Sequence, residues 1–162
     1  MYEQLDAWID AHFDDEVTFL QALVQVPTDT PPGNNAPHAE RTAELLKGFG
    51  FEAEAYPVPE ADVQAYGLTS LTNLIVRRPY ADGGRTVALN AHGDVVPPGD
   101  GWTHGPYSGE IVDGKLYGRA SAVSKSDFAT YTFALRALAA VAAPARGAVE
   151  LHFTYDEEFG GE

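Results

Sequence analysis

Hydrophobic residues recur with two different periods along the chain. Spacings of three and four residues predict amphipathic helices over 3–25, 37–48 and 125–143. Alternating or short apolar runs predict strands over 51–58, 71–78, 86–91 and 147–155. A stretch over 107–118 with Asp113-Gly114 in its middle predicts a β-hairpin.

The last two predicted elements indicate how the sheet is connected. Helix 125–143 follows earlier strands and leads directly into strand 147–155. A strand, a long helix and a strand form a βαβ unit, whose two strands pair in parallel. We therefore expect an α/β fold in which helices flank a mixed, partly parallel sheet, with one domain over residues 1–162.

Composition narrows the classes of partner. Acidic residues number 24 against 10 basic ones, and the formal net charge of −14 disfavours binding to nucleic acid or to anionic membranes. The absence of cysteine excludes thiolate metal sites and cysteine nucleophiles. The sequence shows neither a signal peptide nor a membrane-spanning run, so a cytoplasmic location is expected.

Two predicted strands end on residues that can bind a metal or move a proton. Strand 86–91 leads into His92 and Asp94, and strand 147–155 leads into Glu157 and Glu158. Ligands of open α/β sheets gather outside the carboxyl ends of the strands. His92 could bind a metal while Asp94 holds its other ring nitrogen. Imidazole with carboxylates suits zinc, with cobalt or manganese as alternatives, and one of the two glutamates could bind the metal while its neighbour serves as general base.

Each short pattern taken alone also fits a solvated loop or a charged surface, because His-x-Asp and Glu-Glu are common. Their shared position after predicted strands favours a functional site. Serine hydrolysis is disfavoured, since neither Ser-x-x-Lys spacing nor a Gly-x-Ser-x-Gly elbow occurs.

Longer motifs surround these four residues. They are the run from His92 to Pro97, Trp102, the Pro106-Tyr107 pair, the segment from Asp113 to Arg119, and Asp-Glu-Glu-x-Gly-Gly from Asp156 to Gly161. Together they resemble the M20 metallopeptidase family, which includes acetylornithine deacetylase, succinyl-diaminopimelate desuccinylase, aminoacylase and glutamate carboxypeptidase. The resemblance implies the N-terminal half of a zinc-exopeptidase-like catalytic domain, without its lid or dimerisation domain and its C-terminal part.

By this resemblance His92 is a zinc ligand, Asp94 orients it, Glu157 is the general base and Glu158 is a ligand of a second zinc. The implied reaction is hydrolysis of an amide bond in an N-acyl amino acid or a small peptide. The full-length protein is expected to form a homodimer, and these 162 residues alone are expected to be inactive. The alternative is a non-catalytic relative that binds a small ligand or a single metal.

One position departs from the family motif. An aspartate that bridges both metals in the family corresponds, counting from Arg119, to Val123, and valine cannot bind a metal. Asp127 is the nearest carboxylate and has capping-box spacing from Ser124. We expect Asp127 to cap the helix that begins there rather than to replace the missing ligand.

Overall fold

The structure is a computed structural model that describes residues 1–141, 144 and 146–160. Its helices are α1 (Tyr2–Ala11), α2 (Phe13–Val24), α3 (Ala36–Gly48), α4 (Glu60–Ala65) and α5 (Lys125–Val141). Its strands are β1 (Ala53–Pro57), β2 (Thr72–Pro79), β3 (Thr86–His92), β4 (Glu110–Val112), β5 (Lys115–Tyr117) and β6 (Ala148–Thr154). Within the described ranges, no helix is long and apolar enough to cross a membrane.

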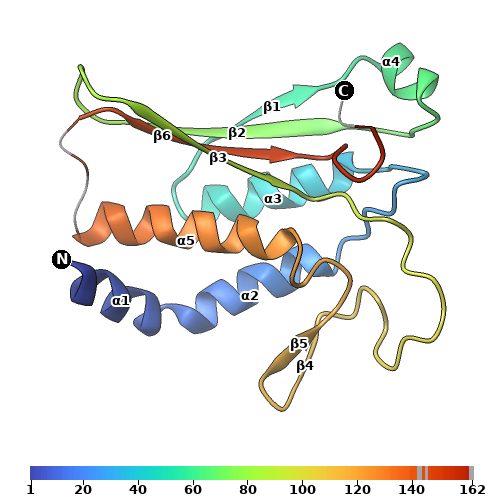
Figure 1. Ribbon diagram of the computed structural model, residues 1–162, viewed down its shortest axis with the longest axis horizontal. Coiled ribbons are helices and arrows are strands. Elements are labelled where there is room, and N and C mark those ends of the chain that lie inside the picture. The colour runs from blue at the N-terminus through green and yellow to red at the C-terminus, as the bar shows by residue number, and fades with distance from the viewer. Residues whose placement is uncertain (142–143, 145, 161–162) are drawn as a thin grey trace.

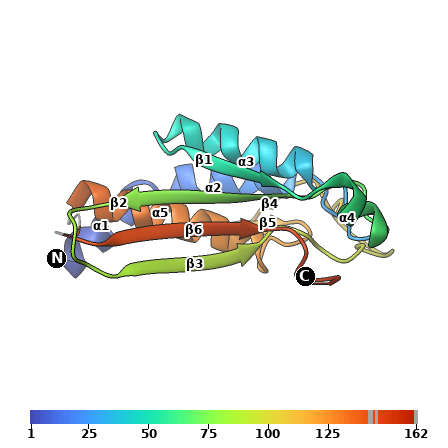
Figure 2. The same cartoon turned by 90° about the horizontal axis from the view of Figure 1, so that it is seen from above.

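The main sheet contains four strands in the order β1-β2-β6-β3, and β4 and β5 form a separate hairpin. The β1–β2 and β2–β6 pairs are antiparallel, whereas β3 and β6 are parallel. Figure 2 shows the four strands side by side with the helices behind them. The mixed, partly parallel sheet predicted from the sequence is confirmed.

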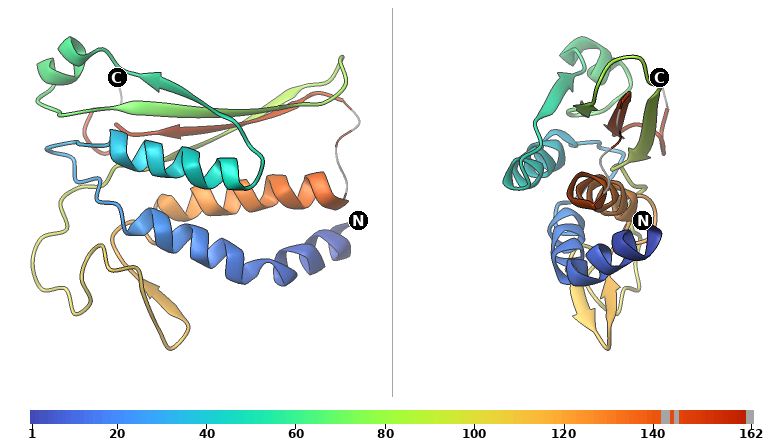
Figure 3. Two further views of the ribbon diagram at one scale, coloured as in Figure 1. Left: turned by 180° about the vertical axis from the view of Figure 1, so that it is seen from behind. Right: turned by 90° about the vertical axis from the view of Figure 1, so that its left-hand side faces the viewer.

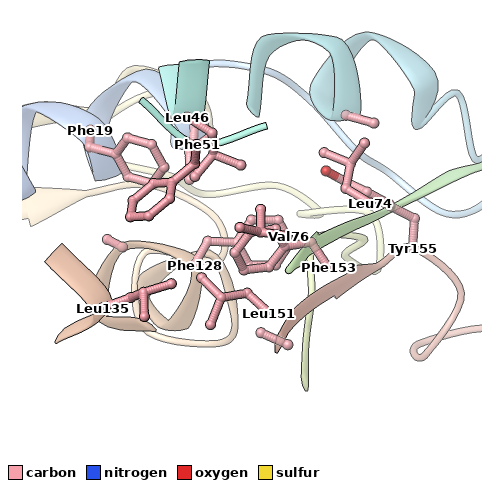
Figure 4. Close-up of a cluster of buried hydrophobic side chains, with 14 of the residues drawn as sticks. Phe19, Leu46, Phe51, Leu74, Val76, Phe128, Leu135, Leu151, Phe153 and Tyr155 are labelled. Atoms are coloured by element: carbon pink, nitrogen blue, oxygen red, sulfur yellow. The ribbon is translucent and has the colours of Figure 1, made fainter. Parts of the chain in front are cut away.

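The helices form a layer on one face of this sheet (Figures 1 and 3). Helix α5 packs against β3 and β6 and also contacts α1 and α2, while α3 packs beside β1 and β2. The apolar sides of the helices and the inward side chains of the strands therefore share one core. Its largest fully buried members include Phe19, Phe128, Phe153 and Tyr155 (Figure 4).

The predicted βαβ unit consists of β3, α5 and β6, with the β4–β5 hairpin inserted before the helix. Its register places His92 opposite Thr154. The Gly93 amide donates a hydrogen bond of 2.8 Å to the Thr154 carbonyl, which continues the pairing beyond β3. Both strands consequently end at the same edge of the sheet.

The helix predicted over residues 3–25 is wrong as a single element, because it is interrupted at His12. The His12 backbone leaves helical geometry, with φ −119° and ψ 14°. Its ring stacks on Trp8 at 3.7 Å, and its Nδ1 bonds the Trp8 carbonyl at 2.7 Å. This side-chain hydrogen bond competes for a carbonyl that a continuous helix would use.

Other boundaries follow the sequence closely, with two exceptions. The short helix α4 was not predicted, because six residues are too few for a helical period to emerge. The end of the predicted helix 125–143 lies partly outside the described residues, since α5 is described as far as Val141. The predicted hairpin is confirmed, with Asp113 and Gly114 at positive φ of 50° and 73°.

Gly93 lies where the end of β3 approaches the core most closely. A Cβ atom at this position would lie 2.5 Å from Cε1 of Tyr155 and 3.2 Å from Cζ of Phe128. Both rings are fully buried, so neither has room to move aside. The close approach of this backbone to the core therefore requires glycine.

We predict that Gly93→Ala lowers the free energy of unfolding by about 1–3 kcal/mol through overpacking. Gly48→Ala is the matched control, because Gly48 is a helical residue and an added Cβ there would meet no atom within 4 Å. That control should be neutral or stabilise by up to about 1 kcal/mol. Urea unfolding of both variants tests this, and equal effects would contradict the steric argument.

Candidate active site

Parallel pairing of β3 and β6 brings two polar segments together at one edge of the sheet. His92 is the last residue of β3, and Glu157 and Glu158 lie in the turn that follows β6. In Figure 1 this edge lies at the right, where both arrows end. A cavity of about 260 Å³ adjoins it, and its lining includes Asn90, Thr154 and Glu157.

The orientation of the His92 ring follows from its contacts with Asp94. Nδ1 of His92 lies 3.1 Å from the Asp94 carbonyl oxygen and 3.4 Å from Oδ1 of the Asp94 carboxylate. A carbonyl oxygen only accepts hydrogen bonds, so Nδ1 carries the proton. Nε2 is left as the acceptor nitrogen, and it lies 3.7 Å from Oε2 of Glu157.

Asp94 connects the two strand ends from a fully buried position. Its Oδ2 accepts a hydrogen bond of 2.9 Å from the Glu158 amide, while its Oδ1 faces His92. Burial raises the pKa of the Asp94 carboxyl, but His92 and the Glu158 amide lower that pKa by more, so it ends below its ordinary value. The ionised carboxylate thus holds both the histidine and the glutamate segment.

The same contact affects His92. The hydrogen bond to Asp94 is the largest cause that raises the pKa of the imidazole above its ordinary value, and burial opposes it. A carboxylate behind a histidine makes the far nitrogen a stronger donor to a metal.

His92, Glu157 and Glu158 form a group that could hold a metal ion. One potential ligand atom from each residue lies within 4.8 Å of the others. Imidazole and carboxylate donors suit zinc. Asp94 remains behind His92, so the structure brings together all four predicted site residues and places Asp94 at the back of the group.

The departure at Val123 is visible in the structure. Val123 is 64% exposed and presents an apolar side chain. Asp127 does not join the group of His92, Glu157 and Glu158 in the described part of the chain. Its Oδ2 accepts a 2.7 Å hydrogen bond from the Ser124 hydroxyl, and its amide donates to the Ser124 carbonyl at 2.9 Å. The expected capping box is therefore wrong in its bonds, because Ser124 and Asp127 pair directly through their side chains and the Asp127 amide bonds a backbone carbonyl instead of the Ser124 hydroxyl.

Sequence reasoning missed Lys125, the first residue of α5. Its side chain is fully buried, and its Nζ donates a 2.8 Å hydrogen bond to the Val26 carbonyl. The ammonium group also lies 5.7 Å from the centre of the Tyr107 ring. Burial lowers the pKa of Lys125 to about 7, and the nearby carboxylates Asp29 and Asp94 oppose this shift. The hydrophobic period of a helix does not predict that a lysine is buried, so no sequence pattern indicated the burial of Lys125.

Lys125 contacts the segment that supports residues 93–95, the loop that contains Asp94. The Thr28 hydroxyl donates a hydrogen bond of 2.6 Å to the Gly93 carbonyl. The Val95 amide donates to the Thr28 carbonyl at 3.1 Å, and the Thr30 amide donates to the Val95 carbonyl at 2.8 Å. Residues 28–30 therefore run beside residues 93–95. Lys125 anchors the start of this segment at Val26.

We predict that the free energy of unfolding rises with pH between about 7 and 10.5 because of Lys125. In this window the unfolded chain holds a proton on Lys125 that the folded chain has lost, so raising the pH favours folding. Lys125→Met should remove this rise, which amounts to at most about 1.4 kcal/mol per pH unit. Urea unfolding from pH 6.5 to 9.5 measures it, with the exposed Lys115→Met as control. Parallel profiles for the natural chain and Lys125→Met would contradict the prediction.

The fold is that of known dipeptidases. Human carnosine dipeptidase 1 is similar with a TM-score of 0.71 and 24% identity, over 95% of this chain and 34% of that one. The di-peptidase Dug1p from Saccharomyces cerevisiae gives a TM-score of 0.75 and 19% identity, over 98% of this chain and 35% of its own. The chain therefore has the α/β fold of these dipeptidases, with a histidine and carboxylates at the ends of two strands.

Sequence similarity relates part of the chain to a peptidase family. Residues 88–162 match the model of peptidase family M20/M25/M40. The succinyl-diaminopimelate desuccinylase of Rhodospirillum centenum is 34% identical over 146 residues, which are 89% of this chain and 36% of the relative. That of Paracoccus denitrificans is 43% identical over 122 residues, or 74% and 29% of the two chains. Residues 88–162 are therefore similar to peptidase family M20/M25/M40, and the chain spans 36% or less of the length of these relatives.

Proposed function

We propose that this chain contributes metal-binding and proton-transfer groups to a hydrolase that cleaves the amide bond of an N-acyl amino acid or a small peptide. The observation that carries the proposal is the group formed by His92, Glu157 and Glu158 at the edge of the sheet. The names of the relatives, a desuccinylase and two dipeptidases, support this substrate class. We propose further that residues 1–162 are the N-terminal part of the catalytic domain and that the whole protein is a homodimer.

The donor set suits one zinc ion. His92 would offer Nε2 and Glu158 a carboxylate oxygen, because Asp94 holds the opposite nitrogen of His92 and the backbone amide of Glu158. When bound, zinc supplies polarisation of the substrate carbonyl and lowers the pKa of water. Val123 offers no oxygen at the bridging position, so we propose that this chain holds a single ion.

Glu157 is the proposed general base. Its side chain is 64% exposed, so substrate and water can reach it, and Oε2 lies 3.7 Å from His92 Nε2. In amide hydrolysis the Glu157 carboxylate accepts the proton of the attacking water and later delivers it to the leaving amine. Asp94 stays ionised behind His92 and keeps the acceptor nitrogen directed towards Glu157.

The proposed roles predict different losses in variants of the two glutamates. Glu158→Gln and His92→Ala should each lower zinc affinity at least about tenfold, because each removes a ligand. Glu157→Gln should change zinc affinity little. In the chain extended to the length of its curated relatives, Glu157→Gln should abolish hydrolysis of N-succinyl and N-acetyl amino acids.

Zinc competition against a coloured chelator measures the affinities, and amine release measures turnover. Glu3→Gln on α1 is the control for the loss of an exposed carboxylate. Zinc loss in Glu157→Gln comparable to that in His92→Ala would make Glu157 a ligand and contradict the assignment.

A second candidate function is favoured by Val123, which removes the bridging carboxylate that the family motif provides. In that case the protein binds one metal or a small ligand without catalysis. Zinc binding by the extended protein without hydrolysis of any N-acyl amino acid or dipeptide tested would favour this alternative.

The single-ion proposal gives a prediction of its own. We expect elemental analysis after dialysis to find one zinc ion per chain in the protein without substitutions. Val123→Asp should raise the ratio of zinc to protein above one, because the new carboxylate supplies a bridging oxygen. Val87→Asp is the matched control, since Val87 is also exposed, at 54%, but lies near the opposite end of β3. Two zinc ions in the natural chain, or equal gains in both variants, would contradict it.

A further inference from the structure

A cavity lies away from the candidate active site, between α3 and β1. Its volume is about 810 Å³. Ala43 of α3 forms part of the apolar lining, and Phe51 and Ala53 contribute from the opposite side. Figure 3 shows α3 alongside β1 at one edge of the sheet. We call this cavity the α3–β1 groove.

One wall of the groove is a lateral edge of the main sheet, formed by its outermost strand. Strand β1 is the terminal strand of the order β1-β2-β6-β3 and pairs only with β2 among the described strands. In a β-strand alternate residues direct their N–H and C=O groups to opposite sides, so β1 presents a row of such groups outward. An edge strand beside a helix is the arrangement in which extended peptides add to a sheet.

The rim of the groove is acidic. Glu40, Glu44, Glu52 and Glu54 line it, against the single cation Lys47. Arg41 pairs with Glu44 at 3.1 Å, and Arg77 pairs with Glu54. Glu40 and Glu52, one on each side of the groove, form no ion pair within the described residues.

We propose that the α3–β1 groove binds an extended basic peptide, which adds to β1 as a fifth strand of the sheet. The peptide backbone pairs with the outer edge of β1. Alternate apolar side chains cover Ala43, Phe51 and Ala53, while lysine or arginine side chains reach Glu40 and Glu52. This interaction surface is separate from the hydrolytic site, so the proposal does not depend on the proposed function.

The test uses the purified 162-residue chain and a fluorescent peptide, acetyl-Lys-Val-Lys-Val-Lys-Val-amide, in a fluorescence anisotropy titration at physiological salt. Binding should weaken at least about tenfold in Glu40→Lys/Glu52→Lys, because both partner charges are reversed. The control is Glu3→Lys/Asp6→Lys on α1, which changes the net charge equally at a distant exposed site and should retain binding. Circular dichroism confirms that both variants fold.

A second peptide tests strand pairing directly. Methylation of alternate backbone nitrogens on the edge that faces β1 removes hydrogen-bond donors and should weaken binding about tenfold, with the charges unchanged. Amide NMR shifts on addition of the unmethylated peptide should concentrate in residues 40–57. An equal loss of affinity in the α1 control variant would overturn the proposal. So would unchanged affinity of the methylated peptide, or amide shifts centred outside residues 40–57.

Discussion

The site depends on the parallel pairing of β3 with β6. Parallel strands end at the same edge of a sheet, so two polar segments more than sixty residues apart in sequence meet there. The crossover through α5 makes this pairing possible, since parallel strands need a long connection. An antiparallel arrangement of the same two strands would place His92 and the glutamates at opposite ends of the sheet.

Asp94 converts this proximity into defined geometry. A buried carboxylate is costly unless it has polar partners, and Asp94 has one in each segment: its Oδ2 accepts a hydrogen bond from the Glu158 amide, and its Oδ1 lies 3.4 Å from Nδ1 of His92. Residues 28–30 and Lys125 enclose the same loop from the other side. The rigid back of the site contrasts with exposed Glu157 and Glu158, whose side chains can adjust to a metal or a substrate.

The acidic composition divides into groups with different environments. Asp94 is buried and linked to the candidate metal site, whereas Glu40 and Glu52 border a groove on the far side of α3. The net charge of −14 therefore does not describe a uniform surface. One set of carboxylates suits a metal cation at strand ends, and the other suits a basic chain along a strand edge.

The sequence by itself predicted most of the element types, the parallel connection and four candidate site residues, because hydrophobic period and strand-end chemistry are local properties. By its resemblance to the M20 family, it also predicted that Val123 stands where a metal ligand is expected. The structure was needed to reveal the break at His12, where the side chain competes for the Trp8 carbonyl four residues earlier, and the burial of Lys125, which depends on tertiary packing. It alone placed Glu157 beside His92, since that distance depends on the β3–β6 register and not on any spacing within a segment.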